Sequence, residues 1–255
     1  MGCLEASVIF MVATCALSVV ARKLAKRHLV EPNQDPSKSS AWILAEEAIA
    51  TFELCAVCYE LSTVCDHFGA LYYGIGLFLA VLWWAMTWEE AKACPYFHFA
   101  DMLTRKRGMF DGLSRIAVET VAGLLVYPYV WTFWALGLST EHRQKAFDLR
   151  CITDMQVSPM NAALVEGAGT MACVLFSLYI NSKASWKISA PLDALVSSVL
   201  VCFALNYTGG YYNPVLATSL KLGCDNDDYV DHLAVYWLAS SLGCIPQMLY
   251  PLIRS

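Results

Sequence analysis

Long apolar stretches separated by short polar segments dominate the pattern of this chain. A membrane-spanning helix needs about 20 mostly apolar residues, and seven stretches reach or approach that length. They cover approximately 4–21, 41–62, 68–88, 115–137, 160–181, 187–207 and 230–250. Two further apolar segments begin at Pro95 and Pro214 and are too short to span. Because proline is favoured at the first helical position, we expect two half-helices that enter the bilayer without crossing it.

The composition agrees with a membrane protein. The chain of 255 residues is 58% hydrophobic and only 15% charged, which is unusual for a soluble domain of this size. The net charge of -5 gives no reason to expect a nucleic-acid partner. The sequence has no evident nucleophile motif and no zinc-type Cys/His spacing. We therefore expect no catalytic residues, no cofactor and no metal, and we expect the lipid bilayer as the surroundings.

Matched positions at one fixed spacing indicate a duplicated unit. The matched pairs are Cys94-Pro95 with Asn213-Pro214, Glu47 with Glu166, and Thr51 with Thr170, each 119 residues apart. In each unit a spanning helix that carries a glutamate precedes a half-helix. Each unit has three spanning helices, an odd number, so the second unit is inverted relative to the first. Inverted repeats with broken helices are typical of channels and transporters. A seven-helix receptor would match the segment count but not this repeat.

Basic residues indicate which connections face the cytosol. Glu5 precedes the first apolar stretch and a basic run at 22–27 follows it. By the positive-inside rule we expect an uncleaved helix with its N-terminus outside, the alternative being a surface-lying or removed segment. Of the 17 basic residues, 13 fall on the same side as this run, and Arg143, Lys145, Arg150 and Lys221 fall on the other. We predict three regions: an N-terminal hydrophobic helix and basic cytosolic linker at 1–40, in which the linker covers 22–40, a first repeat at 41–137, and a second repeat at 138–255.

The two half-helices should meet near the middle of the membrane with their N-termini facing. Helix N-termini have unpaired N–H groups and a partial positive charge. Two of them facing each other oppose the passage of cations and protons but can donate hydrogen bonds to a neutral solute. Asn213 is a strong N-cap whose amide can also donate to a passing oxygen, whereas Cys94 is a poor cap. We therefore expect the two halves of the pore to differ chemically.

Glu47 and Glu166 are ionisable residues inside expected membrane helices. Such residues are costly in lipid and usually face the protein interior. We expect each carboxylate to accept hydrogen bonds from the irregular backbone that leads into a half-helix, because those N–H groups cannot stay unpaired in a membrane. A position at the membrane interface is the alternative for Glu46 and Glu47, but it fits Glu166 poorly because its flanks are apolar.

These motifs resemble those of the aquaporin family over about residues 41–250. Asn213-Pro214-Val215 resembles the second Asn-Pro-Ala box of that family, and the segments that begin at Glu47 and Glu166 resemble its repeated glutamate motifs. The first box reads Cys94-Pro95-Tyr96 instead of Asn-Pro-Ala. This combination looks like the unorthodox aquaporins, or superaquaporins, which include aquaporins eleven and twelve. The Cys-Pro-Tyr form looks like the insect members.

The resemblance implies a fold and a function. The fold would have six spanning helices and two re-entrant half-helices as inverted repeats, here with an extra N-terminal hydrophobic helix. The protein would be a homotetramer with one pore per subunit, and would let water or small neutral solutes such as glycerol or peroxide cross passively. An intracellular membrane, of the endoplasmic reticulum or a vesicle, is favoured over the plasma membrane. The alternative is a non-conducting scaffold or interaction protein with the same fold, prompted by the altered first box.

The family also suggests where a selectivity filter would lie. Leu216 stands where most aquaporins have an arginine, and counting back as the family does gives Gly74, Val201 and Gly210 for the other positions. Small or apolar residues there would make a wide constriction without a fixed cation, which favours less polar solutes. The alternative is that large neighbours fill the space. These neighbours are Tyr72, Tyr73, Tyr211 and Tyr212.

Cysteines and histidines are interpreted mainly as packing residues. Most of the 11 cysteines lie in apolar stretches, where we expect packing and not disulfides. Cys224, beyond the second half-helix, is a candidate structural or redox-sensitive residue, with packing preferred. His98, just after the first box, could line the pore, but a helix-surface or packing position is preferred.

Overall fold

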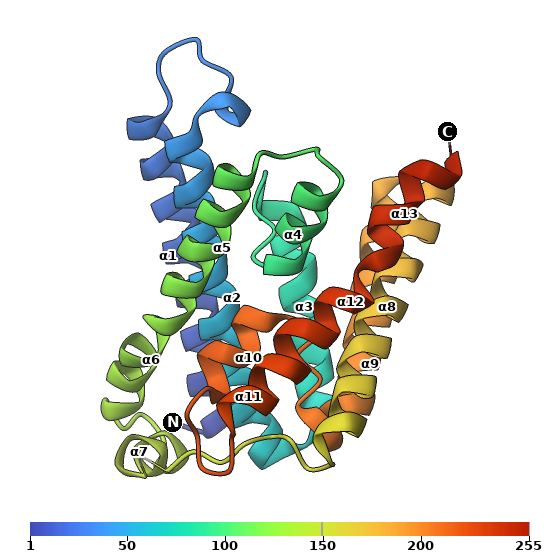
Figure 1. The fold of residues 1–255 in the computed structure, drawn as a ribbon. Coiled ribbons are helices and arrows are strands. Elements are labelled where there is room, and N and C mark those ends of the chain that lie inside the picture. Colours follow the sequence, from blue (N-terminus) through green and yellow to red (C-terminus); the bar gives the residue numbers. More distant parts are fainter. Residues whose placement is uncertain (149, 255) are drawn as a thin grey trace.

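The computed structural model describes residues 1–148 and 150–254 and shows a bundle of helices (Figure 1). The long helices are α1 (Cys3–Leu29), α2 (Ser40–Phe68), α3 (Ala70–Thr87), α5 (Met109–Leu124), α6 (Val126–Ala135), α8 (Pro159–Lys183) and α9 (Trp186–Thr208). The short ones are η1 (Pro36–Lys38), α4 (Pro95–Leu103), α7 (Thr140–Phe147) and α10 (Pro214–Lys221). The chain ends in α11 (Tyr229–His232), the π-helical η2 (Leu233–Ala239), α12 (Ser240–Gly243) and α13 (Ile245–Arg254).

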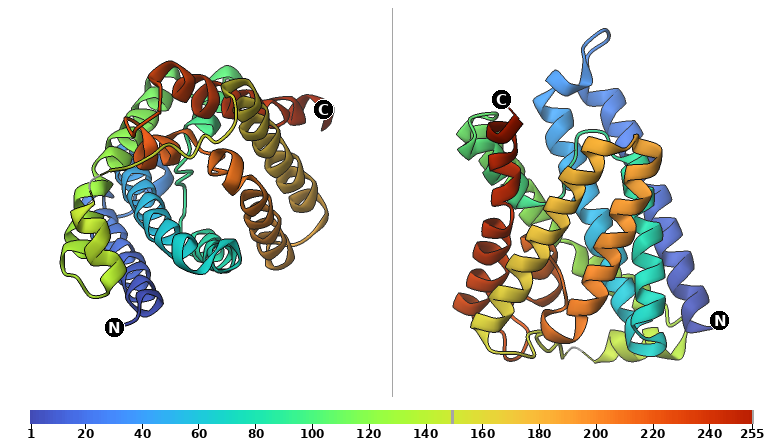
Figure 2. Two further views of the ribbon diagram at one scale, coloured as in Figure 1. Left: turned by 90° about the horizontal axis from the view of Figure 1, so that it is seen from below. Right: turned by 90° about the vertical axis from the view of Figure 1, so that its right-hand side faces the viewer.

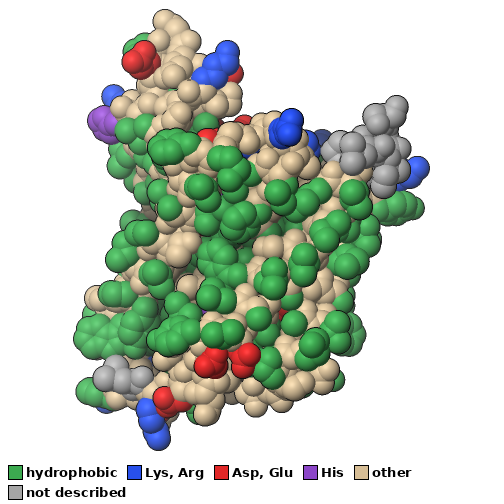
Figure 3. All heavy atoms as spheres, in the orientation of Figure 1, with side chains coloured by type: hydrophobic (Ala, Val, Ile, Leu, Met, Phe, Trp, Pro, Cys, Tyr) green, Lys and Arg blue, Asp and Glu red, His purple; other side chains and the backbone are tan. Residues whose placement is uncertain are grey.

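The lengths and composition of the helices confirm an all-α membrane protein. Six helices of the described residues are long and apolar enough to span a bilayer: α1, α2, α3, α5 continued by α6, α8 and α9. Hydrophobic side chains cover the middle of the face shown in Figure 3, and charged side chains lie mostly near its two ends. This distribution suits a surface whose middle contacts lipid.

The two half-helices occupy the centre of the bundle. In Figure 1, α4 lies in the upper half of the molecule and α10 in the lower half, with α2 and α5 on one side and α8 and α9 on the other. Figure 2 shows from below that the longer helices are arranged around α10. Each half-helix begins at a proline and is too short to span, so each enters the bundle from one end only.

The N-terminal helix packs closely against the rest of the bundle. α1 packs along α2, and two buried polar contacts join them. Ser7 Oγ donates to Glu60 Oε1 at 2.6 Å, and Arg22 Nη1 lies 2.5 Å from Glu53 Oε2. α1 continues to Leu29, so the prediction that a linker begins at residue 22 is wrong. The basic residues there form the last turns of the helix, where positive charge stabilises the C-terminal end of the helix dipole.

Two of the expected spans are not single continuous helices. Pro128 has no N–H to donate to the carbonyl four residues before it, and the helix breaks into α5 and α6 next to that position. The segment predicted at 230–250 is a series of helical pieces and not one continuous helix. Gly243 there lies so close to α8 that a Cβ would be 2.4 Å from the Gly167 carbonyl oxygen. Small residues allow this close packing of membrane helices.

Candidate functional site

The loops that lead into the two half-helices contact each other directly. Asn213 Nδ2 donates to the carbonyl oxygen of Ala93 at 2.8 Å, and both residues are buried. The two loops have matching backbones. Cys94 has φ -155° and ψ 114°, and Asn213 has φ -152° and ψ 114°. The residue before each cap, Ala93 or Tyr212, has a positive φ, of 48° and 46° respectively. The same strained geometry at both positions is strong support for an internal duplication.

The caps of the two half-helices differ. Asn213 Oδ1 accepts hydrogen bonds from the backbone N–H groups of Val215 at 3.1 Å and Leu216 at 3.4 Å. Cys94 makes no side-chain capping bond at the start of α4. Tyr96 in the first box is buried, as is Val215 in the second. The N-terminus of α4 therefore depends on groups other than its own cap residue.

Buried glutamates hold both entry loops by their backbone N–H groups. Glu47 Oε2 accepts from Lys92 at 2.8 Å and from Ala93 at 3.0 Å. Glu166 accepts from Tyr211 at 3.2 Å and from Tyr212 at 2.7 Å. Each pair of donors comprises the two residues that precede the cap, so the two carboxylates have equivalent positions. They satisfy N–H groups that would otherwise be unpaired in the membrane.

The side chain of Glu46 is enclosed by protein and does not extend to the surface as the interface alternative would require. Its side chain is fully buried, and its two oxygens accept from the backbone N–H groups of Glu89 at 2.7 Å and Glu90 at 3.0 Å. Glu46 therefore extends the support of the first loop by two more donors. The sequence suggested the interface because Glu46 lies near the start of its helix.

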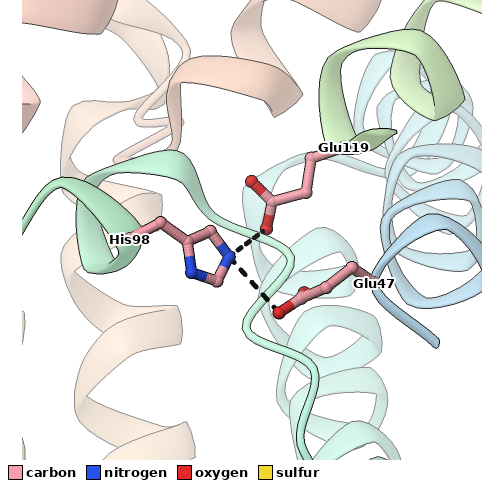
Figure 4. Close-up of side chains that lie close together, drawn as sticks. All are labelled: Glu47, His98 and Glu119. Carbon is pink, nitrogen blue, oxygen red and sulfur yellow. Dashed lines mark hydrogen bonds and ion pairs between the residues drawn. The ribbon is translucent and has the colours of Figure 1, made fainter. Parts of the chain in front are cut away.

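His98 is part of a buried ionic cluster behind the first half-helix, and the interpretation of a helix-surface or plain packing position is wrong. Its Nε2 lies 3.0 Å from Glu119 Oε1 and 3.3 Å from Glu47 Oε1, as Figure 4 shows. Arg115 Nη1 lies 3.5 Å from the same Glu47 oxygen. Glu119 and the role of Arg115 were missed because nothing local in the sequence connects α5 with α4.

The expected filter positions lie among packed side chains. A Cβ on Gly74 would be 2.7 Å from Cys202 Sγ, so α3 and α9 approach each other closely there. A Cβ on Gly210 would be 2.8 Å from the Val201 carbonyl oxygen. Val201 and Leu216 belong to the same buried cluster. Val201 and Gly210 therefore lie next to each other, whereas Gly74 lies at the contact between α3 and α9.

Three of the four neighbouring tyrosines are buried in that cluster. They are Tyr73, Tyr211 and Tyr212, whereas Tyr72 is 47% exposed. The Tyr212 ring lies against Gly169, where a Cβ would be 2.0 Å from Cε1, and its hydroxyl donates to the Leu200 carbonyl at 3.1 Å. The Tyr211 hydroxyl donates to Asp154 at 2.5 Å. Aromatic side chains therefore occupy space next to the second entry loop.

The loop before α8 is clamped to the end of α10 by a disulfide between Cys151 and Cys224. The preference for packing at Cys224 is therefore wrong. The two cysteines are 73 residues apart, and the sequence alone does not pair them. A backbone bridge between Ile152 and Asp225 and an ion pair of 2.7 Å between Lys221 and Asp154 strengthen the same contact.

Comparison with protein-family models finds no match. Comparison with curated proteins finds similarity along most of the chain. The chain is 23% identical to aquaporin-11 of Milnesium tardigradum over 236 residues, which covers 92% of this chain and 82% of that protein. It is 26% identical to aquaporin-12 of Mus musculus over 254 residues, covering 96% and 84%. For aquaporin-11 of Homo sapiens the identity is 25% over 242 residues, covering 94% and 86%.

The fold is similar to that of a solved channel structure. The aquaglyceroporin from Plasmodium falciparum matches with a TM-score of 0.60 and 16% identity, covering 85% of this chain and 99% of that chain. At this identity the similarity concerns the fold alone.

Proposed function

We propose that this chain is an aquaporin of the aquaporin-11 and aquaporin-12 type, to whose members it is similar over most of its length, and that it is a channel for passive transmembrane movement of water and small neutral solutes. The observation that carries the proposal is the contact between Asn213 and Ala93, which joins two half-helices at their N-termini. Two positive helix ends at one point of the membrane oppose cations and protons, while their N–H groups can serve a neutral solute.

The residues around the second half-helix support water, glycerol and hydrogen peroxide as the solutes to test. Leu216 supplies no positive charge at the position where most members have an arginine, so no fixed cation favours water over less polar molecules. Buried Tyr211 and Tyr212 leave less room than Gly210 alone would suggest. We therefore expect a slow, weakly selective channel in which small solutes pass and larger ones do not.

The disulfide and the basic residues support a location and an orientation. A disulfide requires an oxidising compartment, which suits the lumen of the endoplasmic reticulum or a vesicle for the side that carries Cys151 and Cys224. The basic end of α1 lies toward the opposite end of the bundle (Figure 1). These features support an orientation in which the N-terminus lies on the oxidising side of the membrane. The homotetramer and the intracellular membrane are proposed from the family resemblance alone.

Flux into proteoliposomes tests the proposal. Stopped-flow measurements on the purified chain compare water, glycerol and peroxide with empty liposomes, and at least one should enter faster. Asn213→Asp should abolish this flux because it removes the amide that donates to Ala93 and puts a negative charge at the meeting point. Asn33→Asp, an exposed position in the loop between α1 and α2, is the matched control and should leave flux unchanged.

Two flux results would contradict the proposal. A folded, reconstituted wild-type chain that passes none of the three solutes would make the protein a non-conducting member of its family. A flux that survives Asn213→Asp would locate the permeation route away from the half-helices.

A further inference from the structure

A buried group of three side chains with metal-binding atoms lies behind the first half-helix. Glu47 on α2, His98 on α4 and Glu119 on α5 each offer one ligand atom, and these atoms lie within 4.8 Å of one another. All three side chains are fully buried. Figure 4 shows them converging from three separate helices. We call these three residues the Glu–His–Glu cluster.

The spacing of the cluster fits ligands around a shared centre. His98 Nε2 lies 3.0 Å from Glu119 Oε1 and 3.3 Å from Glu47 Oε1. Of these two contacts, the one to Glu119 has hydrogen-bond geometry, and the one to Glu47 is an ion-pair distance alone. Zinc bonds to nitrogen and oxygen are about 2.0–2.2 Å, so neighbouring ligand atoms lie about 2.9–3.4 Å apart, depending on the coordination number. Both observed separations fall in that range.

The charges around the cluster leave room for a cation. Two carboxylates in a membrane interior need compensation. Arg115 reaches Glu47 at 3.5 Å, but its Nε also lies 3.3 Å from Asp111, so its charge is shared. Among the described residues, the ion-pair partner of Glu119 is His98 alone. A cation at the centre would take the place of the proton through which His98 and Glu119 otherwise pair.

The hydrogen bonds of Glu119 and Glu47 also favour a bound cation. Glu119 Oε2 is buried and has no hydrogen-bond partner within the described part of the chain. An unpaired buried carboxylate oxygen is costly unless a ligand uses it. Glu47 Oε2, by contrast, is fixed by the N–H groups of Lys92 and Ala93, which aims Oε1 at His98. Metal ligands are commonly oriented by outer hydrogen bonds of this kind.

From these observations we propose that the Glu–His–Glu cluster binds a divalent cation, and that zinc is the metal it fits best. One imidazole and two carboxylates are a ligand set that zinc accepts, and three protein ligands leave a position for water. The metal would join α2, α4 and α5. It would thereby hold the half-helix whose cap residue, Cys94, makes no capping bond.

Counting zinc on the purified full-length chain tests the proposal without any flux measurement. The chain in detergent is stripped with EDTA, dialysed against zinc chloride and analysed by elemental mass spectrometry. We expect about one zinc per chain and a higher melting temperature with zinc than after EDTA. Cobalt(II) gives a second readout, since its visible absorption reports nitrogen and oxygen coordination.

Variants of matched size assign the bound metal to the cluster. Glu119→Gln and His98→Gln each remove a ligand at nearly constant volume and should weaken zinc binding at least about 10-fold. A control should retain it: His67→Gln changes an exposed histidine at the end of α2.

Two results would overturn the proposal. A wild-type chain that keeps less than about a tenth of an equivalent of zinc after dialysis excludes a resident site, whatever the variants do. Zinc that remains fully bound in both Glu119→Gln and His98→Gln assigns the metal to other residues. Either result makes the cluster a network of ion pairs closed by a shared proton.

Discussion

The loops that lead into α4 and α10, called here the first and second entry, have the same backbone conformation but different side-chain chemistry. Cys94 and Asn213 have nearly identical torsion angles. In each repeat a glutamate, on α2 or on α8, accepts from the N–H groups of the two residues before the cap. At the second entry, the side chain of Asn213 caps the N-terminus of α10. The first has no capping side chain and has Glu46 and the Glu–His–Glu cluster instead.

This difference shows which parts of a duplicated unit are free to diverge. The glutamate in each repeat satisfies backbone N–H groups that every sequence must have, so its role is independent of the neighbouring side chains. A cap bond, in contrast, contributes only about 1 kcal/mol and can be replaced by support from behind the helix. The first entry has no capping side chain and has a buried ionic cluster behind its half-helix.

Removing the carboxylate of the second entry should have the largest effect. Glu166→Ala leaves the N–H groups of Tyr211 and Tyr212 and the hydroxyl of Thr208 without their acceptor. At about 1–3 kcal/mol for each unsatisfied buried group, the loss should exceed about 3 kcal/mol. Thermal melting of the purified chain measures it. Glu31→Ala in an exposed loop is the control, and an unchanged melting temperature in Glu166→Ala would contradict the role of this residue.

Opening the disulfide should have the next largest effect. It clamps the far end of α10, whereas the far end of α4 has ion pairs from Arg107 to Asp101 and Asp111. Replacing both Cys151 and Cys224 by serine should lower the free energy of unfolding by about 2–4 kcal/mol. Reductant should lower the melting temperature of the wild-type chain but not of this variant. If reductant affects both equally, the clamp does not stabilise the second repeat.

Exchanging the caps should have the smallest effect and tests the comparison most directly. Cys94→Asn gives α4 a side chain that can cap it and should add about 0.5–1 kcal/mol of stability, and water flux should rise if weak capping limits it. Asn213→Cys should have the opposite effect on both quantities, because it removes the bonds to Val215 and Leu216. Unchanged water flux in a correctly folded Cys94→Asn variant would show that weak capping of α4 does not limit the flux.

The spanning segments and half-helices were predictable because their signals are local. Apolar length marks a spanning helix, and a proline after a cap residue marks the start of a short one. The repeat spacing led from Glu47 to Glu166 without knowledge of their partners. The boundary of the first helix was wrong because its basic last turns look like a linker, although Arg22 is buried against Glu53.

The packed neighbourhood of the filter positions was not predictable in the same way. Counting along the chain gave Gly74, Val201, Gly210 and Leu216, but it could not tell which large side chains fill the space beside them. That depends on how α3, α8 and α9 approach one another. The burial of Tyr73 and the seating of Tyr212 on Gly169 follow from those helix contacts.

The sequence by itself determined that this is a duplicated membrane protein with two proline-started half-helices and an internal glutamate in each repeat. Hydrophobicity, proline geometry and charge placement act over one or two helical turns, so the order of residues is enough to read them. Only the tertiary structure decided the partners of the buried polar groups. His98 with Glu119, Arg22 with Glu53 and Cys151 with Cys224 meet because distant helices and loops pack together. In a membrane interior each buried charge must find such a partner, and the three-dimensional packing determines which partner it finds.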